Sequence, residues 1–278
     1  MRENTLPKFS IPEKPSKRVP GLLKRIVRKG VPLFTLIVLV AVWQGIALSG
    51  IYPEFIIPAP GAVAEKFLEV FLDGRLWAHT QVTLFAVLAS LLVGSLSGLA
   101  LGYIIAKQPL LEDLISPIVV GFQATPVVAY APLLVIWFGS GVESKIVTGT
   151  LIVFFPMLMN TLVGIRSVPQ GLRDVMRAAR ANRWQTFTKL EIPAAMPVLI
   201  GGLKMSATLA VIGAVVGEFV AARAGLGFLI VTARGTFDTA LVLVAVFTLT
   251  ALALTLYVLV GMLGHYTLAW QRRGNRNR

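Results

Sequence analysis

The ionisable side chains within or beside the long apolar stretches of this sequence are its best candidates for chemistry, because charged groups in lipid are costly and usually functional. Lys204 lies in the apolar stretch 194–217, and Glu218 follows that stretch directly. We expect the flexible stem of Lys204 to carry its ammonium to the membrane surface. Glu218 is expected to pair with Arg223 or Arg234, and its alternative role is in the passage or gating of a substrate.

Sequence motifs for catalysis are missing from the chain. It has no GxxxxGK[ST] phosphate-binding loop, no HExxH pair and no GxSxG turn. It contains no cysteine, and its two histidines, His79 and His265, lie far apart in the sequence. We therefore predict no catalytic residue, no bound metal, no cofactor and no ATP site on this chain.

The composition indicates what kind of elements carry these residues. Hydrophobic residues make up 56% of the chain and charged residues 14%, against about 45–50% and about 25% in soluble globular proteins. So few charges do not cover a water-exposed surface, and so high an apolar content excludes disorder. The lack of cysteine excludes a disulfide scaffold. The sequence therefore predicts an all-α integral membrane protein.

Six stretches are apolar and long enough to cross a membrane, for which a helix needs about 20 residues. They are 31–50, 80–106, 114–138, 146–165, 194–217 and 240–270. The first has a basic flank, but it is too long for a signal peptide and lacks a convincing cleavage site, so we expect a retained helix. The third contains three prolines and the fourth contains one.

The distribution of Lys and Arg predicts the orientation of these spans. Twenty of the 26 basic residues fall in the tail 1–30, the loops 107–113 and 166–193, and the tail 271–278. The loops on the other side hold five basic residues, and the one that remains, Lys204, lies within a span. Because Lys and Arg collect on the cytoplasmic side, both termini are predicted to be cytoplasmic. The net charge of +13 then reflects topology, and nucleic acid is not an expected partner.

Two segments outside the spans have recognisable patterns. The tail 1–30 contains four prolines among its charges and is expected to be largely unstructured. Residues 62–72 place four apolar side chains on one face: Val63, Phe67, Val70 and Phe71. This pattern predicts an amphipathic helix, which either lies at the outer membrane interface or packs on the bundle as a cap.

The cytoplasmic loop that begins at residue 171 is long for a connection between two spans. Its helix-compatible run, 172–190, is expected to be closed by Pro193. One face of the run is apolar and is formed by Leu172, Val175, Met176 and Ala179. Trp184 and Phe187 supply a second apolar face. Two short amphipathic helices of this kind indicate either a packed surface loop or a docking element for a cytoplasmic partner.

Residues 171–204 resemble the EAA loop of binding-protein-dependent ABC importer permeases. The matching positions are Asp174 in the Glu slot, Val175 and Met176 in the Ala slots, Ala181 after the glycine slot, Phe187 in the aromatic slot, Pro193 and Pro197 in the proline slots, and Gly202, Leu203 and Lys204 at the end. The chain departs from the pattern where Arg180 stands in the glycine slot and Asp174 replaces glutamate. Glycine permits a tight turn there, and Arg180 leaves the geometry of that turn open.

Residues 124–169 are similar to the corresponding region of the nitrate/sulfonate/taurine-type permeases. The similar positions are Pro126, Pro132, Trp137, Phe138, Gly139, Ser144, Lys145, Phe155, Pro156, Asn160 and Gly164. The run GLGFLI at 225–230 fits the same group, which also includes thiamine-precursor and riboflavin permeases. The resemblance extends from about residue 31 to residue 270.

The resemblance implies the type I ABC importer permease fold, with six transmembrane helices in residues 31–270 and a coupling loop at 171–193. It implies a multi-pass protein of the cell (inner) membrane that is not itself an enzyme. The implied partners are a second copy of the chain, two copies of a cytoplasmic ABC ATPase, an extracytoplasmic solute-binding protein and membrane lipid.

The same resemblance suggests which residues act in transport. Those implied to contact the ATPase are Asp174, Met176, Arg177, Ala178, Arg180, Ala181, Asn182, Trp184, Phe187, Pro193 and Pro197. The candidates for the translocation pathway are Thr125, Pro126, Asn160, Ser206 and Glu218. Prolines and glycines in the third to fifth spans allow bends around such a pathway.

The cargo expected from this family is riboflavin or a thiamine-precursor pyrimidine. An anion pathway would be expected to show an intramembrane Arg or Lys, and the spans contain only Lys204. The alternative is a sulfonate, taurine or nitrate imported by the same machinery. A stand-alone secondary transporter is a more remote alternative, because it calls for a buried carboxylate relay or an inverted repeat.

Overall fold

The computed structural model describes residues 21–269 of the chain, and the side chains of residues 30–269. Every regular element in this part of the chain is helical. In order the helices are α1 (Gly21–Leu48), α2 (Pro60–Leu72), α3 (Arg75–Lys107), α4 (Pro109–Ala124), α5 (Val127–Phe138), α6 (Val142–Arg166), α7 (Gln170–Ala178), α8 (Arg183–Thr186), the π-helix η1 (Phe187–Glu191), α9 (Ile192–Ala221), α10 (Leu226–Gly235) and α11 (Thr239–Thr267). The predicted basic tail 271–278 and residues 1–20 of the predicted N-terminal tail lie outside the described residues.

Residues up to Tyr52 and residues from Pro53 onward form two separate units. In the first unit, α1 begins at Gly21, earlier than the predicted span. The prediction of an unstructured segment up to residue 30 is therefore wrong for its last ten residues. Its prolines end at Pro20, so the stretch that follows can form helical hydrogen bonds. The part of α1 from Gly30 to Leu48 is apolar enough to cross a membrane.

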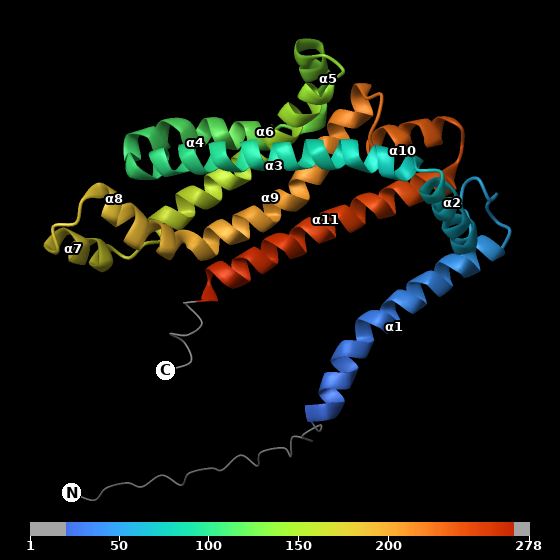
Figure 1. The fold of residues 1–278 in the computed structure, drawn as a ribbon, viewed down its shortest axis with the longest axis horizontal. Coiled ribbons are helices and arrows are strands. Elements are labelled where there is room, and N and C mark those ends of the chain that lie inside the picture. The colour runs from blue at the N-terminus through green and yellow to red at the C-terminus, as the bar shows by residue number, and fades with distance from the viewer. Residues whose placement is uncertain (1–20, 270–278) are drawn as a thin grey trace, which may run out of the picture. The chain divides into compact units, whose positions relative to one another are not determined.

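In the second unit, α3, α6 and α9 pack along one another (Figure 1). Gly94, Gly98 and Gly102, spaced four residues apart, form the face of α3 that meets α6. A Cβ added at Gly98 would lie 2.8 Å from the carbonyl oxygen of Phe154 on α6. Small residues let two helix backbones approach this closely, and in lipid such packing drives helix association.

The contact between α6 and α9 is equally close. A Cβ on Gly213 of α9 would lie 2.5 Å from the Cα of Gly149 on α6. Further along the same pair, a Cβ on Gly202 would lie 2.7 Å from the Cβ of Asn160. Helix α6 is therefore held between α3 and α9 by glycines that the two outer helices turn toward it.

The predicted third span is bent, as its prolines allow. It forms α4 and α5, which meet at an angle of 95°. Pro126 disfavours helical backbone in the residue before it, and Thr125 is accordingly extended, with φ −84° and ψ 123°. With α1, α3, α6, α9 and α11, the described residues contain five helices that are long and apolar enough to span a membrane, or six spans if the bent pair is counted as one.

Helix α2 packs on the bundle, as one of the two alternatives predicted for residues 62–72 expects. Val63 and Val70 are buried, and α2 packs against α3 and α11. Phe67 and Phe71 stay exposed and stack on each other, with ring centroids 5.8 Å apart. The apolar face predicted from the sequence is therefore divided, with its valines in the bundle and its phenylalanines outside.

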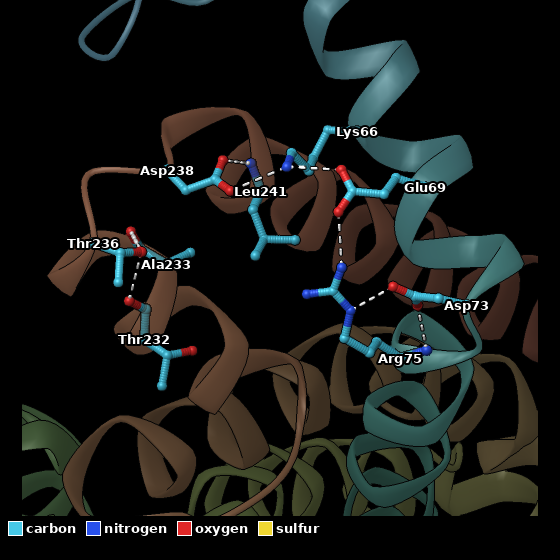
Figure 2. Close-up of polar contacts among 9 residues, drawn as sticks. All are labelled: Lys66, Glu69, Asp73, Arg75, Thr232, Ala233, Thr236, Asp238 and Leu241. Carbon is cyan, nitrogen blue, oxygen red and sulfur yellow. Dashed lines mark hydrogen bonds and ion pairs between the residues drawn. The ribbon is translucent and has the colours of Figure 1, made fainter.

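Charged side chains tie α2 to the starts of α3 and α11, as Figure 2 shows. Lys66 Nζ lies 2.8 Å from a carboxylate oxygen of Glu69 and 3.4 Å from one of Asp238, and Arg75 pairs with Glu69 at 2.9 Å. The hydrogen bond from Lys66 lowers the pKa of Glu69. The bond from the Arg75 backbone N–H lowers the pKa of Asp73. Both carboxylates are exposed. The stability that their bonds add to the folded chain is present at neutral pH and is lost as the pH falls through their lowered pKa values.

Candidate functional site

The segment between α6 and α9 consists of α7, a sharp turn, α8 and η1 (Figure 1). No side chain of α7 is buried, and its apolar residues Leu172 and Val175 are 47% and 62% exposed. Trp184 on α8 is 70% exposed. Clustered apolar side chains left open in this way are typical of an interaction surface. These exposures favour the docking element over the packed surface loop.

The predicted coupling residues divide by exposure. Those exposed are Asp174, Arg177, Ala178, Arg180, Asn182, Trp184 and Pro197, and those half-buried are Met176, Ala181, Phe187 and Pro193. Phe187 packs edge-on against Tyr103 of α3, with ring centroids 4.9 Å apart. The apolar face predicted for Trp184 and Phe187 is therefore divided, because Phe187 packs on the bundle and Trp184 is exposed.

The turn after α7 keeps the geometry that a glycine would give. Arg180 has a φ of 53°, in the left-handed region. Its backbone N–H donates to the carbonyl oxygen of Arg177, and that of Ala181 donates to the carbonyl oxygen of Met176, both at 3.0 Å. This pair of bonds is the Schellman motif that ends many helices. The geometry that the sequence left open at Arg180 is therefore a tight turn made with an arginine.

Asn182 starts the next helix through a reciprocal cap. Its side chain accepts from the backbone N–H of Gln185 at 2.8 Å, and its own N–H donates to the Gln185 side chain at 2.9 Å. Such a box satisfies two N–H groups that the first helical turn leaves without partners. The direction of the chain after the turn is thereby fixed.

Pro193 does not close a helix, contrary to the prediction for the run 172–190. α8, η1 and α9 follow one another without a break from Arg183 to Ala221, and Pro193 lies in the first turn of α9. Proline lacks the N–H that an α-helix interior needs. Here its position coincides with the change from the π-helix η1 to α9, where the regular hydrogen-bond pattern shifts in any case.

A polar cluster around one buried carboxylate, which no sequence pattern indicated, lies beside this turn. The Glu191 carboxylate, buried at the end of η1, accepts a hydrogen bond from the Tyr103 hydroxyl at 2.9 Å and forms ion pairs with Lys107 and Arg173. We call these four residues the Glu191 cluster. Its members come from three places in the sequence up to 88 residues apart, so no local pattern could have revealed it.

A pocket of about 500 Å³ opens between the end of α3 and the turn after α7. Its lining residues are Tyr103, Lys107, Gln108, Ala181, Arg183 and Thr186. Two of the six are cations, and both Tyr103 and Lys107 belong to the Glu191 cluster. The turn is therefore next to a polar, basic recess rather than lying flat on the bundle.

The pathway candidates fall in different surroundings. Thr125 and Pro126 are exposed at the bend between α4 and α5. Asn160 is half-buried, and its side-chain amide donates to the carbonyl oxygen of Pro156 at 2.8 Å. Ser206 and Glu218 are buried within the chain. These five residues belong to the bend between α4 and α5, to α6 and to α9.

Glu218 does not pair with Arg223 or Arg234, which corrects the sequence analysis. Its carboxylate accepts hydrogen bonds from the Thr83 hydroxyl at 2.8 Å and from the Gly227 N–H at 2.6 Å. The turn into α10 folds back over Glu218, and donors from α3 and α10 bind its two carboxylate oxygens instead. Glu218 thus joins α9 to α3 and α10.

Other buried polar groups hold the same turn. Lys145 is 3% exposed and donates to the carbonyl oxygen of Ala224 at 3.1 Å. The Leu226 N–H donates to the Thr83 hydroxyl at 2.8 Å, and the Gly225 N–H to Nδ1 of His79 at 3.1 Å. The sequence placed Lys145 in an outer loop, but it is a buried member of α6.

Lys204 is half-buried on α9, with its Nζ 5.5 Å from the ring centroid of Tyr257 on α11. Such a position over an aromatic face stabilises a cation. Within the described side chains there is no group of three or more His, Asp or Glu residues with the arrangement of a metal site.

Comparison with known proteins decides the family. The model of the family described as the binding-protein-dependent transport system inner membrane component matches residues 98–267. The chain belongs to this family. Among relatives of this inner membrane component, the riboflavin transport system permease protein RibX of Chloroflexus aurantiacus is 47% identical over 87% of this chain and 90% of that protein. The putative aliphatic sulfonates transport permease protein SsuC of Bacillus subtilis is 30% identical over 83% and 82%.

A solved structure agrees on the fold of this inner membrane component. An inward-facing structure of the MetNI methionine ABC transporter matches with a TM-score of 0.63 and 20% identity, covering 70% of this chain and 97% of that chain. The family predicted from the EAA-like loop is therefore confirmed, as is an all-helical ABC importer permease fold. The protein is an ABC importer permease subunit, and the transport role predicted for it is confirmed at that level.

Proposed function

We propose that this chain forms half of the translocation pathway of an ATP-driven riboflavin importer in the cell membrane. The observation that supports riboflavin as the cargo is the 47% identity of this chain to a riboflavin permease over nearly the whole of both proteins. A sulfonate, taurine or nitrate is the second candidate cargo, supported by the 30% identity to a sulfonate permease. A thiamine-precursor pyrimidine, which like a flavin is a nitrogen-containing heteroaromatic compound, is the third.

The assembly has two copies of this chain, two cytoplasmic ATPase subunits and an extracytoplasmic binding protein. Each ATPase subunit docks on α7 and α8, where Leu172, Val175 and Trp184 present open apolar surface. Both termini lie in the cytoplasm, as the excess of Lys and Arg in the tails and in the loop 166–193 favours. Closure of the ATPases on ATP moves the loops and switches the spans between inward- and outward-facing states.

Uptake by the reconstituted importer tests this proposal. The tagged chain is purified gently from its native membranes, and an ATPase and a binding protein are expected to come with it. In proteoliposomes, this complex is expected to accumulate labelled riboflavin only when ATP and the binding protein are supplied. Taurine and a thiamine-precursor pyrimidine, tested in the same vesicles, serve as control cargoes.

The outcomes separate the candidates. ATP-dependent uptake of taurine without riboflavin uptake would keep the machinery and change the cargo. Recovery of the chain alone, with uptake that follows an ion gradient instead of ATP, would overturn the proposal in favour of a secondary transporter.

A further inference from the structure

The Glu191 carboxylate is an unusual residue to find buried beside a membrane bundle. It is 1% exposed, at the last position of η1 and directly before α9. A carboxylate removed from water is strongly destabilising unless donors surround it. Its surroundings therefore decide whether the fold can hold it.

Three donors from two other helices converge on this carboxylate. The Tyr103 hydroxyl and the Lys107 ammonium come from the last turns of α3 and bind different oxygens of Glu191. Arg173 comes from α7, and its Nη1 lies 3.3 Å from Glu191 Oε1. Its other terminal nitrogen, Nη2, donates to the carbonyl oxygen of Ile165 near the end of α6, at 2.7 Å.

The Glu191 cluster thus joins all three closely packed spans to the docking loop. α3 contributes two side chains, α9 follows Glu191, and α6 is reached through Arg173. Arg173 is the only one of the four residues that belongs to α7, so this ion pair is the polar connection between the first loop helix and the start of α9. The neighbouring contact of Phe187 with Tyr103 attaches the other side of the loop to α3.

The backbone at the cluster is also unusual. η1 is a π-helix, a form that is rare and appears frequently at functional sites. In the described chain it occupies Phe187–Glu191, between the capped turn at Asn182 and the long α9. Glu191 is the last residue of this wider turn, and its carboxylate meets two side chains of α3.

We propose that Glu191 is a positioning residue that makes α7 and α8 move as one body with α3, α6 and α9. A displacement of the loop by the ATPase then reaches the spans through rigid, paired contacts instead of being absorbed by bending of the loop. This inference rests on the proposed function, since it gives the Glu191 cluster its role in an ATP-driven importer.

The reconstituted importer, with its ATPase and binding protein, tests the role of Glu191. Glu191→Gln keeps the shape of the side chain and removes the charge that holds Lys107 and Arg173. We expect the ATPase to remain bound and to hydrolyse ATP, while cargo uptake per ATP falls about tenfold or more. Glu191→Asp keeps the charge, and we expect it to recover much of that ratio.

Glu112→Gln is the matched control. Glu112 of α4 also pairs with an arginine, Arg166 in the last turn of α6, and this ion pair includes no residue of α7 or α8. We expect this variant to keep the wild-type uptake per ATP. If Glu191→Gln fails to insert, Arg173→Gln replaces it, because that change leaves the carboxylate its bonds from Tyr103 and Lys107.

The result that overturns the inference is a Glu191→Gln or Arg173→Gln importer that is less stable to heat but has the wild-type uptake per ATP. The Glu191 cluster would then be a structural contact only. Failure of the proposed function looks different, because the wild-type complex itself would show no uptake that depends on ATP.

Discussion

At the turn between α7 and α8, Arg180 adopts a backbone conformation that suits glycine. A side chain at positive φ costs about 1–2 kcal/mol, because its Cβ crowds the following carbonyl. The bonds from Arg180 and Ala181 back to α7 and the cap at Asn182 hold the residue there. Hydrogen bonds on both sides of Arg180 therefore maintain a backbone conformation that arginine itself disfavours.

Substitution at residue 180 measures this conflict. Arg180→Gly is expected to leave the turn intact. Glycine removes the steric cost of the Cβ, but it also gives the unfolded chain more freedom, which offsets part of the gain in stability. Arg180→Val is expected to raise the exchange rate of the Ala181 amide by about tenfold, because a β-branched residue at positive φ adds a penalty of about 1 kcal/mol or more. Hydrogen exchange of the purified permease reports both. Arg177→Val, at a helical position of α7, is the control, and equal exchange in the two valine variants would contradict the argument.

At the scale of elements, glycines set the distance between α3, α6 and α9. The three glycines of α3 recur every four residues, the interval that repeats one face of a helix. α9 contributes Gly202, Gly213 and Gly217 to its contact with α6. Because lipid supplies no hydrophobic force between helices, this close contact is the main source of their association.

A pair of alanine variants tests the contact. Gly98→Ala would place a methyl group 2.8 Å from the backbone oxygen of Phe154, which cannot move without shifting α6. We expect it to destabilise the permease by about 1–3 kcal/mol, as overpacking of a filled core does. Gly201→Ala on α9 meets no atom within 4 Å and is the control. Thermal unfolding of the two proteins in the same detergent distinguishes them, and an equal loss of stability in both would refute the packing argument.

At the scale of the whole second unit, two buried carboxylates lie near the two ends of α9, Glu191 directly before it and Glu218 in its last turn. Glu191 and Glu218 are separated by about 40 Å of helix at 1.5 Å per residue. This matches a bilayer with its headgroups, which is about 40–45 Å thick. Each carboxylate is satisfied by groups from other helices, Glu191 beside the docking loop and Glu218 at the turn into α10. Paired polar groups therefore fix both ends of the bundle, and small residues fix its middle.

Cysteine labelling tests which residues face water during transport. The chain has no cysteine of its own, so single replacements give no background. Thr125→Cys, at the exposed bend, is expected to react with a hydrophilic maleimide at a rate that changes when nucleotide is bound. Ser206→Cys is expected to react at least tenfold more slowly, because its side chain is enclosed by the chain itself. Ser140→Cys, in the exposed turn before α6, is the control that should ignore nucleotide. If the cysteine at residue 206 were labelled as fast as the cysteine at residue 125, this would contradict the placement of Ser206 inside the fold.

Composition and local pattern were enough to predict the spans, the family and the docking loop of this chain. The length of an apolar stretch predicts a span, because a helix needs about 20 apolar residues to cross the hydrocarbon core of a membrane. Such a helix also satisfies its own backbone hydrogen bonds there. The EAA-like loop was visible because its residues lie within one short segment. The spacing of Gly94, Gly98 and Gly102 was also readable, although the sequence analysis did not use it.

The pairing of the polar side chains depends on how the helices pack and could not be predicted from local pattern. The partners of Glu218 are Thr83 and Gly227, and those of Glu191 are Tyr103, Lys107 and Arg173. These groups meet because helices distant in sequence pack side by side, and a buried carboxylate is stable only where such donors converge. The tight turn at Arg180 has the same origin, since bonds from its neighbours outweigh the preference of the residue itself.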